Sequence, residues 1–151
     1  MSERASESSA QREPFRLRMS VRSYELDPQR HVNGAVFHQY ADHSRFECVR
    51  AAGVVIDDLI ADGMGPVNLE TTIRFLHELR GGDEVDVTCT FGWSLGRTHT
   101  VEHEVRRTDG VVAAQVRTVS GLLDLRTRKL VADPAAVWRS RASRPELLGL
   151  S

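Results

Sequence analysis

One change in hydrophobic periodicity constrains the fold of this chain more than any other feature. Over residues 34–52 the apolar side chains recur at helical spacing, and Val36, Phe46 and Val49 widen the apolar surface beyond a single stripe. Over residues 66–125 the pattern instead alternates with a period of two. A helix that is apolar on several sides needs other elements around it, and the alternating segments predict a sheet that can surround it.

Local signals predict where these elements end. Asn33 is a good N-cap for the long helix, and Gly53 is a typical stop signal after it. Residues 54–62 favour a short second helix that ends at Gly63, and an Asp-Gly pair ending at Gly110 predicts a tight hairpin. The predicted strands cover residues 14–24, 66–78, 84–95, 98–108 and 111–125, the last continuing to 129, and a short terminal helix covers 134–141.

The order of these elements predicts one α+β domain. The chain is predicted to form a strand, a long helix and four antiparallel strands. One antiparallel sheet of about five strands wrapped around the one long central helix agrees with both the helical and the alternating hydrophobic pattern. We expect this domain to span residues 14–133, with residues 134–151 as a C-terminal extension. Residues 1–13 are rich in Ser, Glu and Arg and have no apolar periodicity, which predicts a disordered tail.

Composition argues against several classes of function. Lys and Arg (20) nearly balance Asp and Glu (21), which leaves a net charge of −1 and no basic field for nucleic acid. No apolar run approaches the roughly 20 residues that span a bilayer, and the first residues lack the apolar stretch of a signal peptide. We therefore expect a cytoplasmic protein that binds neither nucleic acid nor membrane. Cys48 and Cys89 have no CxxC spacing and favour buried thiols.

The stretch from Tyr24 to Gly53 contains the residues most informative about function. It combines an aromatic residue, two acidic residues two positions apart (Glu25 and Asp27), a short loop, and the sequence HVNG before an aromatic-rich helix. This arrangement resembles the N-terminal signature of the hydroxybenzoyl-CoA thioesterase-like branch of hotdog-fold enzymes. Its LDxxxHVN core is also similar to that of plant acyl-carrier-protein and acyl-lipid thioesterases.

The resemblance implies a fold, an activity and an assembly. The hotdog fold is a sheet wrapped around one long helix, which agrees with the predicted elements. The implied activity is hydrolysis of an acyl thioester, either acyl-CoA or acyl-carrier protein, without a cofactor or a metal. Hotdog relatives pair their sheets edge to edge, so we expect a homodimer or homotetramer in which each site is built from both chains.

Asp27 and Gly34 are the two residues expected to supply the groups that thioester hydrolysis requires. Hydrolysis needs a group that attacks the carbonyl carbon or activates water, together with donors for the oxyanion. Gly34 begins the predicted helix, and a helix N-terminus has unpaired N–H groups and a partial positive charge. A carbonyl oxygen on the Gly34 N–H would place its carbon near the Asp27 carboxylate. In the resembled family the matching Asp is the nucleophile or general base, and the matching N–H polarises the carbonyl.

The loop residues also have purely structural interpretations. An Asp in a polar loop before a helix is commonly a turn former, and motif and strand order favour catalysis for Asp27. Asn33 is favoured as a helix cap over a direct contact with substrate, although both roles are compatible. His31 either orients the loop or contacts substrate. Glu25 is favoured as a surface carboxylate.

Two arginines and two aromatic residues complete the candidate substrate-binding set. Arg30 occupies a position where many relatives have Gly (DxxG), and it either narrows the pocket or contacts a phosphate of the carrier arm. Some hotdog thioesterases of polyketide pathways lack the acid and rely on a helix arginine, whose position Arg45 matches. An ordinary surface pair with Asp42 is the favoured alternative for Arg45. Phe37 and Tyr40, at helical spacing, favour packing over substrate contact.

The sequence His99-Thr-Val-Glu-His103 matches HxxEH, which binds zinc only on a helix. This segment contains Val and Thr, alternates with a period of two and leads into a hairpin turn, so it predicts a strand. Residues four apart on a strand are separated by about 13 Å. The two histidines therefore do not share a metal ion.

Two other functions fit the same fold. A hotdog hydratase or dehydratase uses an Asp and a His as acid and base, commonly in a DxNPLH-type loop with five positions between them. Here Asp27 and His31 are four positions apart and the Asn-Pro is missing. A non-catalytic acyl-thioester-binding module commonly has an attached DNA-binding segment, for which we expect no room in the thirteen residues before the first strand.

Overall fold

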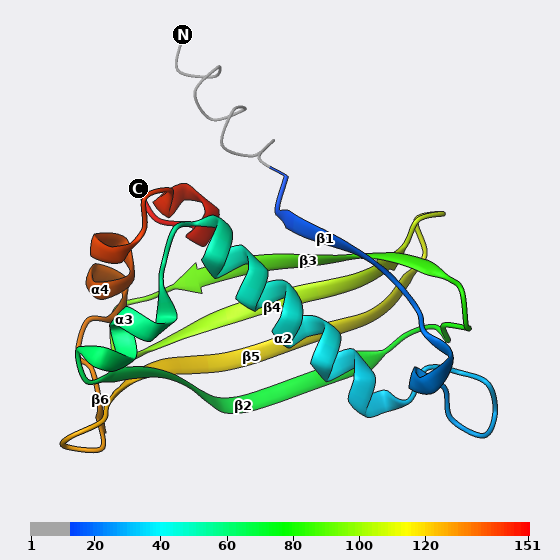
Figure 1. Ribbon diagram of the computed structural model, residues 1–151, viewed down its shortest axis with the longest axis horizontal. Coiled ribbons are helices and arrows are strands. Elements are labelled where there is room, and N and C mark those ends of the chain that lie inside the picture. The colour runs from blue at the N-terminus through cyan, green and yellow to red at the C-terminus, as the bar shows by residue number, and fades with distance from the viewer. Residues whose placement is uncertain (1–12) are drawn as a thin grey trace, which may run out of the picture.

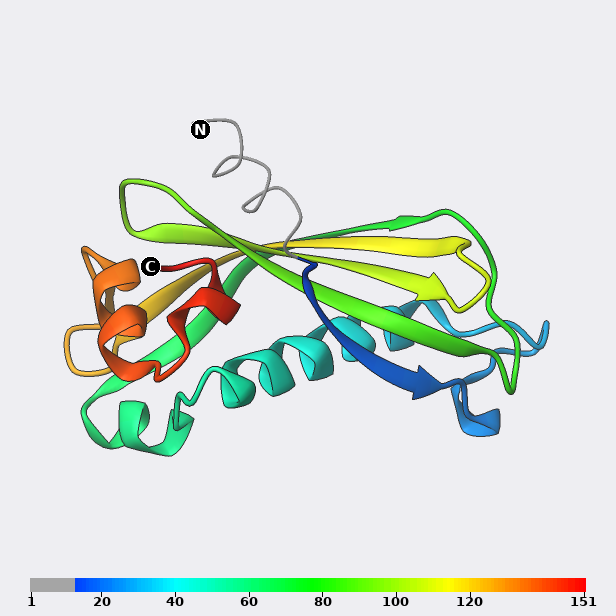
Figure 2. The ribbon, with the colours of Figure 1, turned by 90° about the horizontal axis from the view of Figure 1, so that it is seen from above.

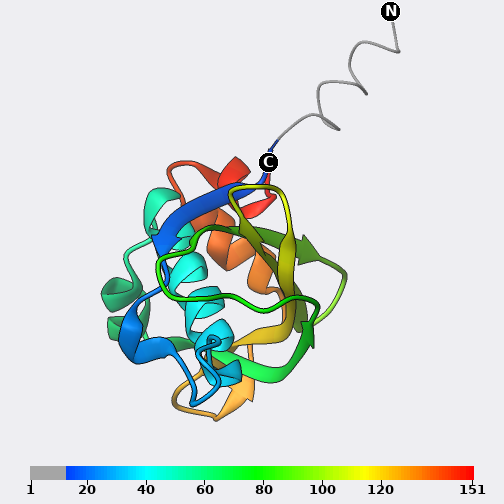
Figure 3. The same ribbon diagram turned by 90° about the vertical axis from the view of Figure 1, so that its right-hand side faces the viewer.

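A curled antiparallel sheet wraps around one long helix in the computed structural model, which describes residues 13–151 (Figures 1 and 3). The strand order is β1-β3-β4-β5-β2, and the short β6 pairs with β5. This arrangement confirms the predicted α+β hotdog layout of about five strands around a central helix. The predicted tail, apart from Glu13, lies outside the described residues.

The bounds of most elements agree with the sequence patterns. The strands are β1 (Phe15–Ser20), β2 (Met64–Phe75), β3 (Glu84–Trp93), β4 (Thr98–Arg107), β5 (Val112–Asp124) and β6 (Lys129–Leu130). The helices are η1 (Ser23–Glu25), α2 (Gly34–Ala51), α3 (Ile56–Ala61), α4 (Pro134–Arg141) and η2 (Pro145–Leu148). None of the helices within residues 13–151 has both the length and the apolar character that crossing a membrane requires.

Helix α2 begins and ends where its capping residues predict. The Asn33 side chain accepts a hydrogen bond from the Ala35 N–H at 3.0 Å, so Asn33 is the N-cap. Gly53 follows the helix with φ of 87°, a conformation that favours glycine and stops the helix. The buried face packs on the sheet through Phe37, Tyr40, Ala41, Ser44, Cys48 and Val49.

Strand β2 forms one edge of the sheet and is less regular than predicted. The alternating pattern places Leu69, Thr71, Ile73 and Phe75 on one face, but the register with β5 shifts between Asn68 and Glu70. This irregularity leaves Leu69 outside the register, and 52% of it is exposed. The strand therefore presents a long free edge with exposed apolar side chains.

Two segments differ from the sequence prediction for local reasons. The first strand ends at Ser20 rather than Tyr24, because the chain turns into the short helix η1. The Arg22 N–H donates a hydrogen bond to the Glu25 carboxylate at 2.8 Å across this helix. Residues 125–128 form a turn rather than the end of a strand. The Asp124 carboxylate accepts hydrogen bonds from the Arg126 and Thr127 N–H groups at 2.9 and 3.2 Å, and the chain then returns as β6.

The predicted C-terminal extension, residues 134–151, packs on the same core as the sheet. Asp133 caps α4 through the Ala136 N–H. Trp138, Leu148 and Leu150 are buried in the cluster that also contains Cys48 of α2. Figure 2 shows α4 and the C-terminal segment gathered at one end of the sheet. The two cysteines are buried and free, as predicted.

Candidate active site

Asp27 lies in a small closed loop between η1 and α2. The Asp27 N–H donates to the His31 carbonyl at 2.7 Å, and the Arg30 N–H donates back to the Asp27 carbonyl at 2.9 Å. Leu26 and Val32 form a bridge below these bonds. These main-chain bonds hold Asp27 in a defined position relative to the start of α2.

The two oxygens of the Asp27 carboxylate have different environments. Oδ1 accepts hydrogen bonds from the N–H groups of Gln29 and His31 at 2.9 and 3.2 Å, so the turn-forming interpretation is correct for this oxygen. Oδ2 receives no hydrogen bond from any other residue within 13–151. One oxygen is held by the loop, and the other has no partner among these residues.

Gly34 is the first residue of α2, and an aromatic ring from β2 lies over it. A Cβ at this position would stand 3.3 Å from Cζ of Phe75, so any larger residue would press on that ring. Phe75 also packs edge to face with Phe37, with ring centroids 5.7 Å apart. The ring is 61% exposed. Phe75 is a site residue that the sequence analysis missed, because only the fold brings this end of β2 to the helix N-terminus.

Arg30 adopts a backbone conformation that normally belongs to glycine. Its φ is 67°, in the left-handed region that side chains with a Cβ avoid. The Gly found in this position of the resembled signature is therefore explained by the tight turn. The Arg30 residue itself is exposed, and its side chain has no hydrogen-bond partner within residues 13–151.

We expect Arg30→Gly to raise the free energy of unfolding by about 0.5–1 kcal/mol, since relief of the left-handed conformation outweighs the added chain entropy. Arg128 has φ of 62° in the remote turn after β5, so Arg128→Gly is a matched control with a similar expected gain. Urea unfolding measures both. If Arg30 contacts the carrier arm, only Arg30→Gly raises KM for acyl-CoA. A loss of stability in Arg30→Gly would contradict the strain argument.

Glu25 is buried, so its interpretation as a surface carboxylate is wrong. Only 7% of it is exposed, and its carboxylate accepts hydrogen bonds from the Tyr40 hydroxyl at 2.7 Å and from the Arg22 main chain and guanidinium. The Glu25 carbonyl accepts from the Asn33 N–H at 2.9 Å. Glu25 therefore ties the loop to the start and the middle of α2.

Tyr40 is a supporting residue of this network. Its side chain is 1% exposed, and burial, together with the bond to Glu25, raises the pKa of its hydroxyl. Phe37, 4% exposed, packs beside it at a centroid distance of 6.4 Å. Both aromatic residues lie in the core beneath the loop, in agreement with the packing interpretation favoured by their spacing.

His31 contacts a carboxylate that the sequence did not single out. Its Nε2 lies 2.8 Å from Glu78 Oε2, in the connection between β2 and β3. The hydrogen bond from Arg80, together with the charge of nearby His31, holds the pKa of Glu78 below its usual range. This contact orients the His31 ring and anchors the loop to the connection between β2 and β3.

Arg45 lies on α2 and reaches the sheet. The predicted pair with Asp42 is present at 3.0 Å, but Nη1 also donates to Asn68 Oδ1 at 2.7 Å and to Ser120 Oγ at 3.4 Å. Eleven residues of helix separate Arg45 from Gly34, which is about 16 Å at the usual rise per residue. Arg45 is thus not part of the loop that contains Asp27.

The HxxEH sequence lies on strand β4, as predicted, and its histidines are buried in the sheet. Burial lowers the pKa of both His99 and His103 to about 4. His103 Nδ1 lies 2.8 Å from the Thr88 carbonyl oxygen. Within residues 13–151, no group of three or more His, Cys, Asp or Glu residues is arranged to hold a metal ion.

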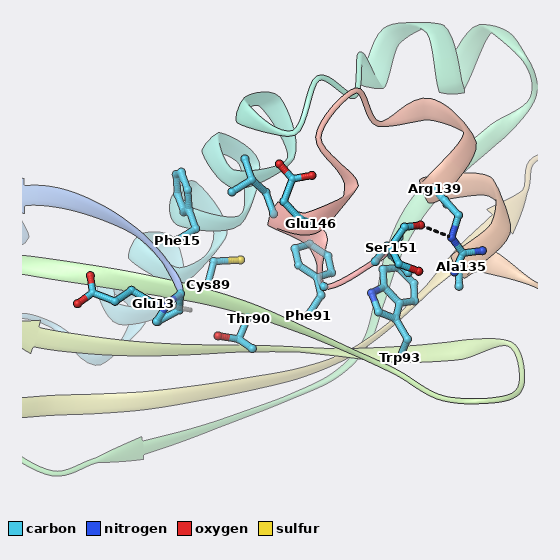
Figure 4. A pocket seen from close by; sticks show the side chains of 14 residues that line it. Glu13, Phe15, Cys89, Thr90, Phe91, Trp93, Ala135, Arg139, Glu146 and Ser151 are labelled. Atoms are coloured by element: carbon cyan, nitrogen blue, oxygen red, sulfur yellow. Dashed lines mark hydrogen bonds between the residues drawn. The ribbon is translucent and has the colours of Figure 1, made fainter. Parts of the chain in front are cut away.

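A large hollow of the structure lies away from Asp27. Its volume is about 950 Å³, and its walls are the start of β1, strand β3, α4 and the C-terminal segment (Figure 4). Phe15, Cys89 and Trp93 line it, and Arg139 donates a hydrogen bond to the Ser151 carbonyl at its rim. None of the predicted site residues lines this hollow.

Comparison with known proteins identifies the class that this fold and loop define. The family model described as the thioesterase-like superfamily matches residues 21–140, which include the loop and every strand of the sheet except β1. The chain therefore belongs to the thioesterase-like superfamily.

Individual relatives agree with this membership. The acyl-acyl carrier protein thioesterase ATL3, chloroplastic, of Arabidopsis thaliana is 37% identical over 84 residues, which cover 55% of this chain and 44% of that protein. The chain thus spans less than half the length of this curated relative. YbaW, a probable thioesterase from Escherichia coli, has a TM-score of 0.75 and 20% identity, covering 84% of this chain and 95% of its own.

A second solved structure supports the fold. Slr0204, a 1,4-dihydroxy-2-naphthoyl-CoA thioesterase from Synechocystis, has a TM-score of 0.77 and 17% identity, covering 85% of this chain and 95% of its own. At such low identity the two structural matches establish the hotdog fold alone.

Proposed function

We propose that this protein hydrolyses an acyl thioester of coenzyme A or acyl carrier protein, with Asp27 as the nucleophile or general base. The observation that carries the proposal is the free Oδ2 of Asp27 on a loop that leads directly into the glycine-started helix α2. Membership of the thioesterase-like superfamily and the likeness to an acyl-carrier-protein thioesterase support it. The composition described above supports the cytoplasm as the location.

The chemistry assigned to this loop uses a carboxylate and a backbone N–H. The thioester oxygen accepts a hydrogen bond from the Gly34 N–H, where the helix dipole also stabilises negative charge. As a general base, Asp27 takes a proton from water while the oxygen of that water bonds to the carbonyl carbon. The tetrahedral oxyanion then collapses, the C–S bond breaks, and the departing thiolate receives the proton. As a nucleophile, Asp27 displaces the thiolate to form a mixed anhydride that water hydrolyses. Both routes yield the acid and the thiol.

The neighbouring residues have supporting roles in this proposal. The Glu78 contact holds His31, and His31 donates its main-chain N–H to the Asp27 carboxylate. Arg30 extends from the same turn into solvent, where a carrier phosphate is its expected partner. Phe75 packs against Gly34, at the start of the helix that provides that N–H.

A hydrolysis panel tests the function. Purified protein is assayed with acyl-CoA and acyl-carrier-protein substrates that share the same acyl groups, aromatic and aliphatic, and thiol release is followed with a thiol reagent. We expect thiol release with at least one acyl group, and none from the same substrates incubated without the protein. Crotonyl-CoA is included to measure water addition. Hydration of crotonyl-CoA without thiol release from any substrate would favour the hydratase alternative instead.

We expect the protein to assemble through the free edge of β2 into a homodimer or homotetramer. Leu69→Glu should then shift the mass measured by light scattering towards that of one chain, because the charge lies on that edge. Leu95→Glu is the matched control, since Leu95 is fully exposed at the turn between β3 and β4. A parent protein that is monomeric and fully active would contradict the expected assembly.

We expect thioester hydrolysis to be independent of metal ions, because the assigned chemistry needs only Asp27, water and the Gly34 N–H. Incubation with EDTA followed by desalting should leave kcat within about 20% of the untreated value, which is ordinary assay scatter. Loss of a catalytic group would instead lower kcat about tenfold or more. Addition of zinc or manganese should then restore nothing. Loss of activity that returns with one of these ions would refute the prediction.

A further inference from the structure

Two neighbouring turns form an exposed projection at one end of the sheet. One turn joins β3 to β4 and contains Leu95 and Arg97, and the other joins β5 to β6 over residues 125–128. A hydrogen bond of 2.9 Å from Arg97 Nη1 to the Leu130 carbonyl holds the two turns together. Figures 1 and 2 show them at the end of the sheet where α3 and α4 lie, opposite the loop that contains Asp27.

Four basic side chains are exposed on this projection, and we call them the basic tip: Arg97, Arg126, Arg128 and Lys129. None of them takes part in an ion pair within residues 13–151. Arg107 and Arg117, elsewhere on the sheet, are instead paired with carboxylates at 2.6 and 3.5 Å. The positive charge of the basic tip is therefore available to a partner from outside the chain.

Asp124 is the only acidic residue of these two turns, and it cancels little of this charge. Its Oδ1 accepts hydrogen bonds from the N–H groups of Arg126 and Thr127 at 2.9 and 3.2 Å. These bonds hold the pKa of the Asp124 carboxyl below its usual range, so it carries one negative charge at neutral pH. Four positive charges stand against this single negative one, which leaves a strong positive excess.

Two features of the projection do not stabilise the isolated chain. Arg128 has φ of 62°, a left-handed conformation that glycine would adopt with less strain. Leu95 is fully exposed, so its side chain gains nothing from burial. Backbone strain that persists at an exposed position is typical of functional segments. The strained arginine and the exposed leucine indicate a surface that makes contacts outside the chain.

The shape of the basic tip favours a protein partner over a small molecule. Small-molecule sites are concave, whereas these side chains project from turns, and none of them lines the hollow shown in Figure 4. Basic side chains spread over a projecting surface are complementary to an acidic protein surface. Leu95 adds an apolar contact among the charges, a combination that is common in protein–protein interfaces.

We propose that the basic tip and Leu95 dock the protein part of an acyl-carrier-protein substrate, through an acidic surface of that carrier. The proposal rests on the proposed function and deepens it. It names the carrier-protein thioester, rather than the coenzyme A thioester, as the form of the substrate that this surface recognises. The docking residues contribute to recognition and take no part in the chemical step.

The basic tip is positioned to serve the active site of the partner subunit in the expected assembly. Residues 114–124 of β5 run from the Phe75 end of β2 to the tip, about 33 Å at the usual rise, so the Asp27 loop of the same chain is too distant. Antiparallel pairing of two β2 edges places the Met64 end of one strand beside the Phe75 end of the other. Partner β2, β2, β5 and β6 then follow one another, which separates the partner's edge from β6 by three strand spacings, about 14 Å. The flexible arm of a carrier protein bridges such a distance.

Charge reversal tests the docking surface. A bacterial acyl carrier protein charged with a decanoyl group is compared with decanoyl-CoA as a substrate of the parent and of the tip variant, Arg126→Glu with Lys129→Glu. We expect KM for the carrier substrate to rise at least about tenfold, because attractive pairs become repulsive. Both kcat and the KM for decanoyl-CoA should stay within about twofold of the parent, since the catalytic loop is unchanged.

Two further variants show whether position or net charge decides. Arg50→Glu with Arg144→Glu is the matched control, because it changes the net charge equally at exposed positions outside the basic tip. It should leave both KM values within about twofold of the parent, since separate surface charges are screened by salt. Leu95→Glu should raise KM for the carrier substrate at least about threefold, because it replaces an apolar contact with a repelling charge. Retained hydrolysis of decanoyl-CoA shows that each variant is folded.

Mixed assemblies test which subunit the basic tip serves. Asp27→Asn chains and tip-variant chains are given different affinity tags, co-expressed and purified through both tags. The only intact Asp27 of such an assembly lies in the chain whose tip is reversed, so the parent KM for the carrier substrate requires the tip of the other chain. A parent chain paired with a chain that carries all three changes should instead show the raised KM.

The outcomes separate this proposal from the proposed function. An unchanged KM for the carrier substrate in both the tip variant and Leu95→Glu overturns the docking surface, and an equal rise for decanoyl-CoA assigns the tip to coenzyme A instead. The opposite pattern in the mixed assemblies overturns the assignment to the partner subunit. If the parent hydrolyses no thioester, the proposed function fails, and isothermal titration of decanoyl carrier protein still tests docking. Binding to the parent that the tip variant loses supports the docking surface, and absence of binding to the parent overturns it.

Discussion

Asp27→Asn should lower kcat for thioester hydrolysis by about 10²–10⁴, the usual contribution of one general base, and by more if Asp27 is a nucleophile. The asparagine oxygen can still accept the hydrogen bonds that the Gln29 and His31 N–H groups donate to Oδ1, so the loop keeps its shape. Only the charge and basicity of the second oxygen are lost. KM should change little, because the loss belongs to the transition state.

The turn after β5 supplies a matched control for this substitution. Asp124 accepts the same kind of main-chain hydrogen bonds, from Arg126 and Thr127, far along the chain from the loop. Asp124→Asn should therefore leave kcat unchanged. Glu25→Gln should cost much less than Asp27→Asn, and His31→Ala an intermediate amount. Hydrolysis by Asp27→Asn within about threefold of the parent rate, combined with complete loss in Arg45→Ala, would replace our assignment with an arginine-dependent one.

Glu25→Ala should lower the free energy of unfolding by about 2–4 kcal/mol, because it leaves the buried Tyr40 hydroxyl and the Arg22 N–H without their acceptor. The loop should also lose its side-chain tie to Tyr40 of α2, so kcat should fall even though Glu25 does not touch the substrate. Urea unfolding monitored by circular dichroism measures the stability change.

A double-mutant cycle separates the network from the rest of the loop. Tyr40→Phe removes the hydroxyl, so the double variant Glu25→Ala, Tyr40→Phe should be destabilised by less than the sum of the two single changes. Glu84→Ala, at an exposed strand position, is the control and should stay within about 0.5 kcal/mol of the parent. Additive losses would show that Glu25 and Tyr40 do not depend on each other.

Features that depend on near neighbours were predictable from the sequence. The helix α2 follows from its apolar spacing, its Asn33 cap and the glycine after it, and these act within a few residues of one another. The Asp27 turn is equally local, since its side chain bonds to main-chain groups two and four residues later. The order of strands and helix, together with the motif that begins at Tyr24, led to the fold and the superfamily.

Contacts between distant segments depended on the tertiary structure. The burial of Glu25 requires Tyr40 fifteen residues later, and the partners of Arg45 are 23 and 75 residues away. The register shift in β2 interrupts the alternation of apolar and polar residues, and no residue preference in the sequence indicates where it occurs. Phe75 over Gly34 and Glu78 beside His31 follow from the curl of the sheet. Local hydrogen bonding and periodicity thus determined the elements and the reactive loop, whereas the surroundings of the loop were decided by packing that no short stretch of sequence encodes.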